Sequence, residues 1–424
     1  MSTPIDILST PVTLPCGLVV PNRIVKGPMA ENLSSGTSHH PNDLLNTVYR
    51  VWGEGQYGML VTGNVQVDPR FLGGPGDVTF APSDLKNPVA LSAWKIWAHA
   101  SQDSGTPTVV QLCHPGRQSP FGAGTRGFFT KNIAPSAVGL DLKGSFLTKL
   151  AQALLFGTPK EMTLKDIDEV VEMFVNGARM SYLAGFKGVQ LHAAHGYLIT
   201  QFLSPKINRR TDAYGGTPEN RLRFILRIIE ETRRATSPEF CIGVKLNSSD
   251  YQSMGITDEE VLGQVAALDE AGVDFIDISG GTYEDPRMAQ VSNGKPVRES
   301  TKLRESFFQE FSEKARKAVK KGCVIMVTGG FRSRVGMAAA VTDGACELVG
   351  IARPACLIPD VPKSVWLNKD LPDEEAVVKP AKIKGGEWLS MIPILGVGMQ
   401  SLWHGMQIRR IAAGKKPDLD MRMF

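Results

Sequence analysis

The feature that most limits the fold is an alternation of short β-branched runs with amphipathic helical runs along most of the chain. This alternation predicts parallel strands joined by crossover helices. Eight such units predict an α/β fold, a TIM (β/α)8 barrel. An open doubly wound sheet is disfavoured, because no Gly-x-Gly-x-x-Gly motif directly follows a strand-like run. The strand-like runs are Arg23–Lys26, Gly58–Val67, Thr106–Cys113, Gly188–Leu191, Phe240–Leu246, Phe275–Ser279, Cys323–Thr328 and Leu348–Ile351.

Helix start and stop signals separate these runs. Thr163 with Asp166 is typical of a helix N-terminus, and Gly185 is a suitable end for the helix that follows. Thr257 with Glu260 predicts a capping box. The predicted helices are Asp43–Gly53, Leu91–Ser104, the run between Thr163 and Gly185, Pro218–Ala235, Thr257–Ala271, Thr301–Lys320 and Arg332–Asp343.

Two segments depart from the alternation. Residues 114–160 are rich in Gly, Pro, Ser and Thr, with a short helix predicted near Phe146–Phe156. A loop of this length in a compact domain is usually functional or mobile, so we expect an excursion on the substrate side. Residues 371–424 add no ninth unit. We therefore expect one barrel domain over residues 1–370 and a C-terminal extension that packs on the barrel or on a second subunit, as in a homodimer.

Composition restricts the partners. The net charge of the 424-residue chain is only +4 and no Lys/Arg block stands out, which argues against nucleic acid. No two of the six cysteines are separated by only two or three residues, which argues against a zinc ribbon or an iron–sulfur cluster and suits a reducing compartment. The apolar stretch Trp388–Trp403 is too short and too interrupted for a stable membrane span. With no signal peptide visible, we expect a cytoplasmic protein.

Polar residues concentrate just past the fourth strand-like run. His192, His195 and Tyr197 lie within six positions, and a basic, Gly-rich loop follows from Asn208 to Gly216. One buried histidine is usually a satisfied core residue. Three polar aromatic groups at a strand end are instead typical of an active site on a barrel rim.

A second candidate site follows the last two strand-like runs. Gly329 and Gly330 expose backbone N–H groups before a predicted helix, and Arg353 follows the next strand beside Ala352. A helix N-terminus and a guanidinium both favour an anion. Barrels often bind phosphate after strands seven and eight, so this pair of strand ends predicts a phosphate site.

The segment HAAHGYLITQFLSPKINRRTDAYGG, residues 192–216, resembles the signature of the old yellow enzymes, the flavin-dependent ene-reductases. The resemblance recurs in order along nearly the whole chain. It implies non-covalent FMN, NADH or NADPH as reductant, and an activated alkene such as an enone, an enal or a nitroalkene as substrate.

By the same resemblance, Pro28, Met29 and Gly63 would supply backbone contacts to the flavin ring. Gln111 would bind the pyrimidine edge, and Lys245 would place positive charge near the N1/C2 carbonyl edge. Gly329, Gly330, Ala352 and Arg353 would hold the phosphate. Ala30 departs from the family pattern, because many relatives carry Cys or Thr there and so contact the flavin. Lys245 stands where Arg is also common.

The resemblance also assigns the chemistry. His192 and His195 would hold the substrate carbonyl and stabilise the enolate as hydride passes from flavin N5 to the β-carbon. Tyr197 would protonate the α-carbon as general acid. Two alternatives stay open: a metal-dependent barrel lyase or hydrolase that uses His192 and His195, and a non-catalytic flavoprotein. The pair of histidines without acidic ligands at nearby strand ends makes the metal alternative the weaker one.

Overall fold

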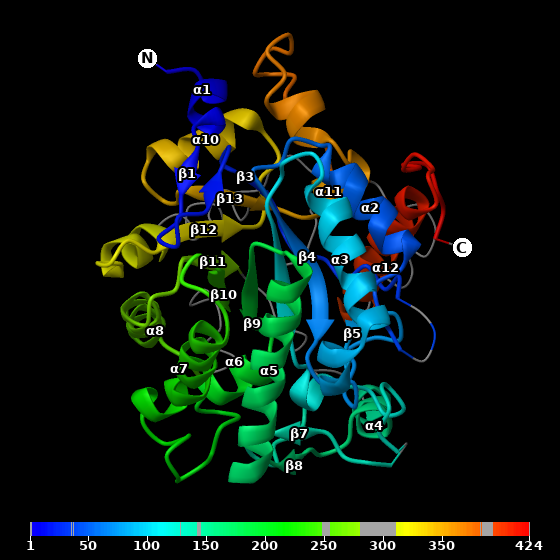
Figure 1. Ribbon diagram of the computed structural model, residues 1–424, viewed down its shortest axis with the longest axis vertical. Coiled ribbons are helices and arrows are strands. Elements are labelled where there is room, and N and C mark those ends of the chain that lie inside the picture. The colour runs from blue at the N-terminus through cyan, green and yellow to red at the C-terminus, as the bar shows by residue number, and fades with distance from the viewer. Residues whose placement is uncertain are drawn as a thin grey trace.

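The chain folds into a closed barrel of eight parallel strands in the computed structural model (Figure 1). Strand β13 pairs with β3 and β3 pairs with β4, which closes the sheet. This confirms the predicted TIM barrel. The strands are β3 (Ile24–Lys26), β4 (Met59–Gln66), β6 (Thr108–Cys113), β9 (Gly188–Ala193), β10 (Cys241–Asn247), β11 (Phe275–Ser279), β12 (Val324–Thr328) and β13 (Leu348–Ile351). The structure describes residues 2–34, 36, 38–127, 129–141, 146–247, 255–279, 311–381, 383 and 393–423, with backbone only for 146–147 and 393–399.

Helices form the outer layer, and their ends follow the predicted signals. Thr163 and Asp166 form a capping box at the start of α5, and Gly185 ends it with φ 93°. Thr257 caps α8 in the same way. Most of the predicted helix Thr301–Lys320 lies outside the described residues. Its described part is helical over residues 311–318. The barrel helices are α2 (Asp43–Gly53), α3 (Pro88–Gln102), α5 (Leu164–Ala184), α6 (Leu198–Leu203), α7 (Pro218–Ala235), α8 (Asp258–Glu270), α10 (Arg334–Thr342) and α11 (Arg353–Leu357).

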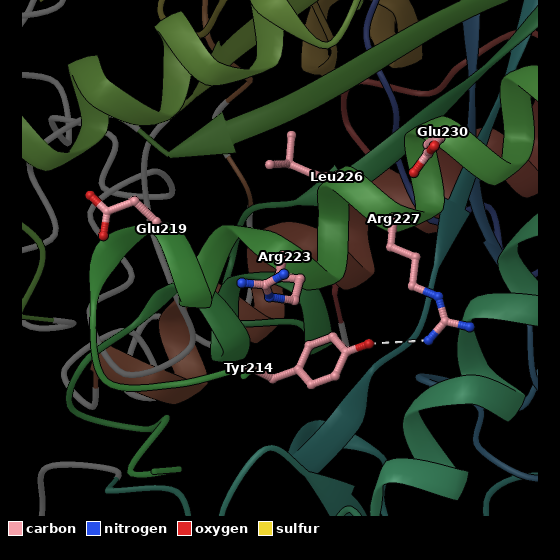
Figure 2. A pocket seen from close by; sticks show the side chains of 6 residues that line it. All are labelled: Tyr214, Glu219, Arg223, Leu226, Arg227 and Glu230. Atoms are coloured by element: carbon pink, nitrogen blue, oxygen red, sulfur yellow. Dashed lines mark hydrogen bonds between the residues drawn. The ribbon is translucent and has the colours of Figure 1, made fainter. Parts of the chain in front are cut away.

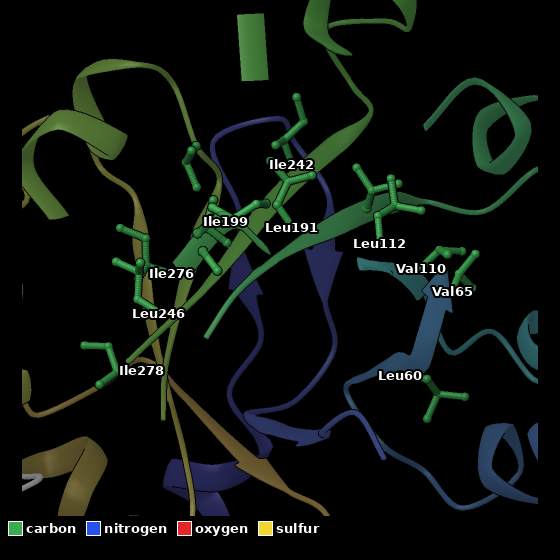
Figure 3. Packing of buried hydrophobic residues seen from close by; sticks show 14 of the residues in the cluster. Leu60, Val65, Val110, Leu112, Leu191, Ile199, Ile242, Leu246, Ile276 and Ile278 are labelled. Atoms are coloured by element: carbon green, nitrogen blue, oxygen red, sulfur yellow. The ribbon is translucent and has the colours of Figure 1, made fainter. Parts of the chain in front are cut away.

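Side chains of each strand alternate between two cores. Those that face the helices form the larger core; Figure 3 shows part of it. Those that face the barrel axis form a smaller cluster that includes Val109, Phe275 and Met326. Because side chains alternate along a strand, the residues two and four positions after each of these three also face the barrel axis. Lys26 is an exception among the outward residues, because its buried Nζ lies 4.1 Å from the centroid of the Trp52 ring.

The N-terminal segment closes the end of the barrel at which the strands begin, the upper end in Figure 1. A short hairpin, β1 (Val12–Thr13) and β2 (Val19–Val20), adds Val12, Leu14 and Val20 to the inward apolar cluster. Helix α1 (Pro4–Ser9) contacts α10. The barrel interior is thus filled with apolar side chains where the strands begin, and the polar residues lie toward the carboxyl ends of the strands.

The excursion after β6 contains structure of its own. Strand β7 (Ile133–Ala134) pairs with β8 (Lys160–Glu161), and the chain between these two strands contains helix α4 (Phe146–Leu155). Arg210 of the basic loop is buried and donates to the carbonyl oxygens of Pro135 and Met162. This arginine therefore ties the signature loop to the excursion and is structural. Elsewhere, β5 (Val78–Thr79) extends the sheet beside β4, and short helical turns cover Pro82–Lys86, Gly116–Gln118 and Pro362–Trp366.

The C-terminal extension ends in helix α12 (Pro393–Ala412), which contacts α2 and α11 (Figure 1). Trp403 is fully buried, and its Nε1 donates to the Met421 carbonyl at 3.0 Å. Arg409 Nη2 donates to the Asn32 carbonyl in the loop after β3. In the described part of the chain, no helix is long and apolar enough to cross a membrane.

Candidate active site

A row of hydrogen-bonded polar side chains crosses the barrel interior toward the carboxyl ends of the strands. Gln111 of β6 donates from Nε2 to Gln190 Oε1 at 2.6 Å, and Gln190 Nε2 donates to Asp277 Oδ2 of β11 at 3.2 Å. Gln111 faces inward because it lies two residues past the inward-facing Val109. These bonds leave Gln111 Oε1 as an acceptor for a group at the barrel mouth.

Lys245 belongs to the same row. Its Nζ lies 2.6 Å from Asp277 Oδ2, and both side chains are buried. Thr328 of β12 donates to the other carboxylate oxygen at 2.6 Å. Asp277 therefore holds the Lys245 side chain in position below the barrel mouth, since a buried cation needs a partner of opposite charge.

His192 and His195 are bonded to each other, and the bond fixes their tautomers. The Ala194 amide donates to His192 Nδ1 at 3.2 Å, so neutral His192 carries its proton on Nε2. That nitrogen lies 3.2 Å from His195 Nδ1, which must accept. His195 then presents Nε2–H, 3.4 Å from Ser279 Oγ. Burial lowers the pKa of His192 well below 6.5, and the neighbouring His195 and Lys245 act in the same direction, so the ring is neutral.

Backbone contacts hold His195 in a left-handed conformation. Its φ is 59°, which costs free energy in a residue other than glycine. The Asn247 side chain accepts its amide N–H at 3.0 Å, and Gln118 Nε2 donates to its carbonyl at 3.0 Å. Tyr197 lies two residues later and is the N-cap residue of α6. Its ring centroid lies 4.7 Å from that of His192 at 86°, and Asn64 Nδ2 lies 3.5 Å from its hydroxyl.

The loop after β3 carries Pro28, Met29 and Ala30, of which Ala30 is exposed. Met29 Sδ lies 3.3 Å from the Cys356 thiol of α11, so the loops after the first and last barrel strands meet here.

Gly63 lies inside β4, at an irregularity of pairing between Val61 and Asn64. Its amide donates to buried Glu31 at 2.9 Å. A Cβ at Gly63 would come within 2.2 Å of the Met29 carbonyl, so no other residue fits. The close approach brings β4 against the loop after β3, and Glu31 occupies the amide that was expected to face the flavin.

The strand ends at which the sequence predicts a phosphate site also carry a further arginine, Arg332. Gly329 and Gly330 follow β12 with φ 140° and 77°, and a Cβ on either would meet no described atom within 4 Å. Ala352 precedes α11, which begins at Arg353. Burial lowers the pKa of Arg332 to about 10, with the charge of Arg353 contributing, and its Nη1 is buried with no hydrogen-bond partner among the described residues. Two mutually repelling guanidinium groups beside a glycine pair with open space at its Cβ positions are an arrangement that a bound anion would stabilise.

A hollow of about 530 Å³ on the outer face of α7 lies away from this mouth (Figure 2). Arg227 pairs there with Asp168 and Glu231, and it donates to the Tyr214 hydroxyl at 3.1 Å. Arg227 is therefore already paired with protein groups in this hollow.

Sequence reasoning missed several members of the site. Gln190 and Asp277 interrupt apolar strands at inward positions, and this alternation could have identified them. Arg332 was considered only as the start of a helix, although it follows the glycine pair directly. No local signal marks Glu31 as the partner of Gly63. Gly280 and Gly281, which follow β11, lie outside the described residues.

Comparison with known proteins identifies the class. The model of the NADH:flavin oxidoreductase / NADH oxidase family matches residues 8–374. The chain is 42% identical over 383 residues to the NADH-dependent flavin oxidoreductase iliE of Hypocrea jecorina, with 90% of this chain and 94% of that protein covered. It is 39% identical over 414 residues to the NADH-dependent flavin oxidoreductase iccE of Talaromyces variabilis, with 96% and 98% covered. Among solved structures, morphinone reductase has the same fold, with TM-score 0.67, 23% identity and coverage of 84% and 88%.

The chain therefore belongs to the NADH:flavin oxidoreductase family, which confirms the resemblance to the old yellow enzymes. It is a flavin oxidoreductase with a nicotinamide reductant. The residues present suit FMN. The two arginines beside the uncrowded glycine pair suit a phosphate, and the Gln111 amide and the Lys245 ammonium suit the polar edge of a flavin ring.

Proposed function

We propose that the protein is an FMN-dependent ene-reductase that oxidises NADH or NADPH and reduces the C=C bond of an α,β-unsaturated carbonyl compound or a nitroalkene. The observation that carries this proposal is the position of His192, His195 and Tyr197. They gather at the end of β9, above the polar row of Gln111 and Lys245. The relatives named NADH-dependent favour NADH as the reductant.

FMN, when bound, would accept hydride from the nicotinamide and deliver it to the substrate β-carbon. Gly329, Gly330, Arg332 and Arg353 would hold its phosphate. Ala352 would contribute backbone beside them, and Pro28, Met29 and Ala30 would border the ring. Lys245 would face the edge where negative charge accumulates on reduction, and Asp277 would keep this lysine in place at 2.6 Å.

The two histidines would bind the substrate oxygen. His195 Nε2–H is the donor at the outer end of the chain of hydrogen bonds, and Ser279 is its resting acceptor. The second donor of the pair is His192 Nε2–H, which donates to His195 in the absence of substrate. Binding of a carbonyl oxygen would therefore exchange these internal bonds for bonds to substrate. The donors would then stabilise the negative charge that develops on that oxygen.

Tyr197 would supply the proton. Its hydroxyl is protonated at neutral pH, since an ordinary tyrosine has a pKa of about 10. The ring is 8% exposed and packs edge-on against His192. Its hydroxyl thus shares the mouth with the oxygen-binding histidines while it belongs to a different residue, which lets one group bind oxygen and another protonate carbon.

Spectroscopy of the purified protein tests this proposal. We expect yellow protein whose heat-released cofactor elutes with FMN in chromatography. Under nitrogen, NADH should bleach the absorbance, and an enone such as cyclohexenone should restore it. NADH should act faster than NADPH at equal concentration. Colourless protein that FMN cannot reconstitute, or bleached protein that no activated alkene reoxidises, would contradict the proposal.

A further inference from the structure

The C-terminal helix α12 brings one titratable side chain toward the anion site. His404 is buried, with 3% of its surface exposed. Helix α12 contacts α11, which begins at Arg353. Arg409, five residues further along, reaches the Asn32 carbonyl in the loop after β3. The helix therefore spans the first and last strand loops of the barrel, and His404 lies on its buried side.

Hydrogen bonding fixes the orientation of the His404 ring. Its Nδ1 lies 2.7 Å from the Gln400 carbonyl one turn earlier, and a carbonyl can only accept, so Nδ1 carries the proton. Trp403 packs beside it with ring centroids 5.1 Å apart. Because Nδ1 faces the backbone of its own helix, Nε2 is on the edge of the ring that faces away from it. Nε2 makes no hydrogen bond to any described residue.

The charges that act on His404 are those of the anion site. Burial, together with repulsion from Arg353 and Arg332, lowers the pKa of His404 to about 4, although the bond to the Gln400 carbonyl acts in the opposite direction. Within the described chain these two guanidinium groups, one on α11 and one after β12, are the charged groups that act on it. On α12 itself, Arg409 and Arg410 bind carbonyl oxygens, those of Asn32 and Lys416.

We propose that His404 is a ligand of the flavin phosphate, and that it takes up one proton when the phosphate binds between it and the two arginines. This inference rests on the proposed binding of FMN. In the protein without FMN the ring is neutral at pH 7, with Nδ1–H bonded to Gln400 and Nε2 unprotonated. A phosphate dianion reverses the sign of the local field. Nε2 then gains a proton from solvent and donates to a phosphate oxygen, while the Nδ1–H bond is kept.

The direction of the pH dependence follows from this proton. FMN binding takes up a proton at every pH between about 4, the pKa without FMN, and the higher pKa of the complex. In that range a rise in pH weakens FMN binding by up to about tenfold per pH unit. Above about pH 6 the phosphate of free FMN is mostly a dianion, so its own titration adds little to the pH dependence of FMN binding. Measurements from pH 6.5 to 9 therefore report mainly on His404.

The test compares two isosteric replacements in the full-length apoprotein. The amide of His404→Gln reaches toward the Nε2 position and donates at any pH, whereas that of His404→Asn reaches only toward Nδ1. FMN affinity is measured by quenching of flavin fluorescence. Proton uptake is measured by calorimetry in two buffers of different ionisation enthalpy. Riboflavin, which lacks the phosphate, is the second ligand, and Leu402→Gln, at an exposed position of the same helix, is the control variant.

We expect wild type and Leu402→Gln to take up close to one proton per FMN at pH 7 and none with riboflavin. His404→Gln should lose this uptake and the pH slope. His404→Asn should bind FMN about 10- to 100-fold more weakly at pH 7, as expected for a lost hydrogen bond to a charged group, with riboflavin affinity unchanged.

Equal FMN affinity and equal pH slope in all variants would overturn the inference. If the His404 variants fail to fold, equal proton uptake by wild type with FMN and with riboflavin would overturn it as well. Wild type and Leu402→Gln that bind no FMN at all would instead contradict the proposed function.

Discussion

The two ends of the candidate site differ in how they are assembled. The substrate end takes His192, His195 and Tyr197 from one strand end and the turn after it. The anion end takes Arg332, Arg353 and His404 from three segments, one of which is the C-terminal helix. The first is a local motif, whereas the second exists only once the barrel has closed and α12 has packed on it.

The two ends also differ in charge, although burial acts on both. At the substrate end, burial keeps His192 neutral, so it can donate one proton in a hydrogen bond without attracting an anion. At the anion end, burial brings the pKa of Arg332 down only to about 10, so the charge remains at neutral pH. The same desolvation thus yields a neutral donor pair for a carbonyl and a charged cluster for a phosphate.

The largest expected effect is that of Tyr197→Phe, which changes only the substrate end. The ring and its edge-on packing against His192 are kept, and only the hydroxyl is lost. Reoxidation by an enone should slow by about 10²- to 10⁴-fold, the cost of a lost general acid. FMN affinity and reduction by NADH should stay close to wild type in stopped-flow traces. Reoxidation at the wild-type rate would show that another group supplies the proton.

A smaller loss is expected for His195→Ala. One donor to the substrate oxygen disappears, and removal of such a donor costs about 10²-fold or more in rate. Stopped-flow reoxidation by an enone measures the loss, and dithionite reduction of the same variant is the control.

Because the pKa of His192 lies well below 6.5, titration of His192 should cause no change in the wild-type rate between pH 6.5 and 8. Rescue of a chelator-treated wild type by zinc would favour a metal role for these histidines.

This contrast explains what could be predicted from sequence. Period-two alternation and caps such as Thr163 and Thr257 act within a few residues, so strands and helix ends were predicted to within about three residues. The cluster of His192, His195 and Tyr197 is equally local. Alternation could mark Asp277 as an inward-facing residue, but its pairing with Lys245, like that of Glu31 with Gly63, is set by packing across the barrel.

The next effect is confined to the anion end. Arg332→Met keeps the length of the side chain and removes the charge, so FMN should bind about 10- to 100-fold more weakly, the cost of a lost charge-assisted contact. The same should hold for Arg353→Ala. Fluorescence quenching measures the affinity, and riboflavin affinity should not change. At saturating FMN, reoxidation by an enone should match wild type, since neither arginine lies at the substrate end. A loss restricted to reoxidation would break the division into two ends.

The smallest expected effect is that of Ser279→Ala, which tests the chain of hydrogen bonds at the substrate end. The Ala194 amide donates to His192, His192 to His195, His195 to Ser279, and the Ser279 hydroxyl to the Leu246 carbonyl at 3.4 Å. Every member donates in the same direction, so Ser279 accepts the very proton that the substrate oxygen would need.

Removing this acceptor should leave His195 Nε2–H more available. Since a neutral hydrogen bond is worth about 0.5–1.5 kcal/mol net, KM for an enone should fall by no more than about tenfold, with FMN affinity unchanged. Steady-state kinetics on wild type and Ser279→Ala decides the sign. A rise in KM would mean that Ser279 orients His195 and does not compete for it, so that the tautomer chain is needed intact when substrate is bound. Asn64→Ala is the matched control, because Asn64 approaches the Tyr197 hydroxyl at 3.5 Å and takes no part in the chain.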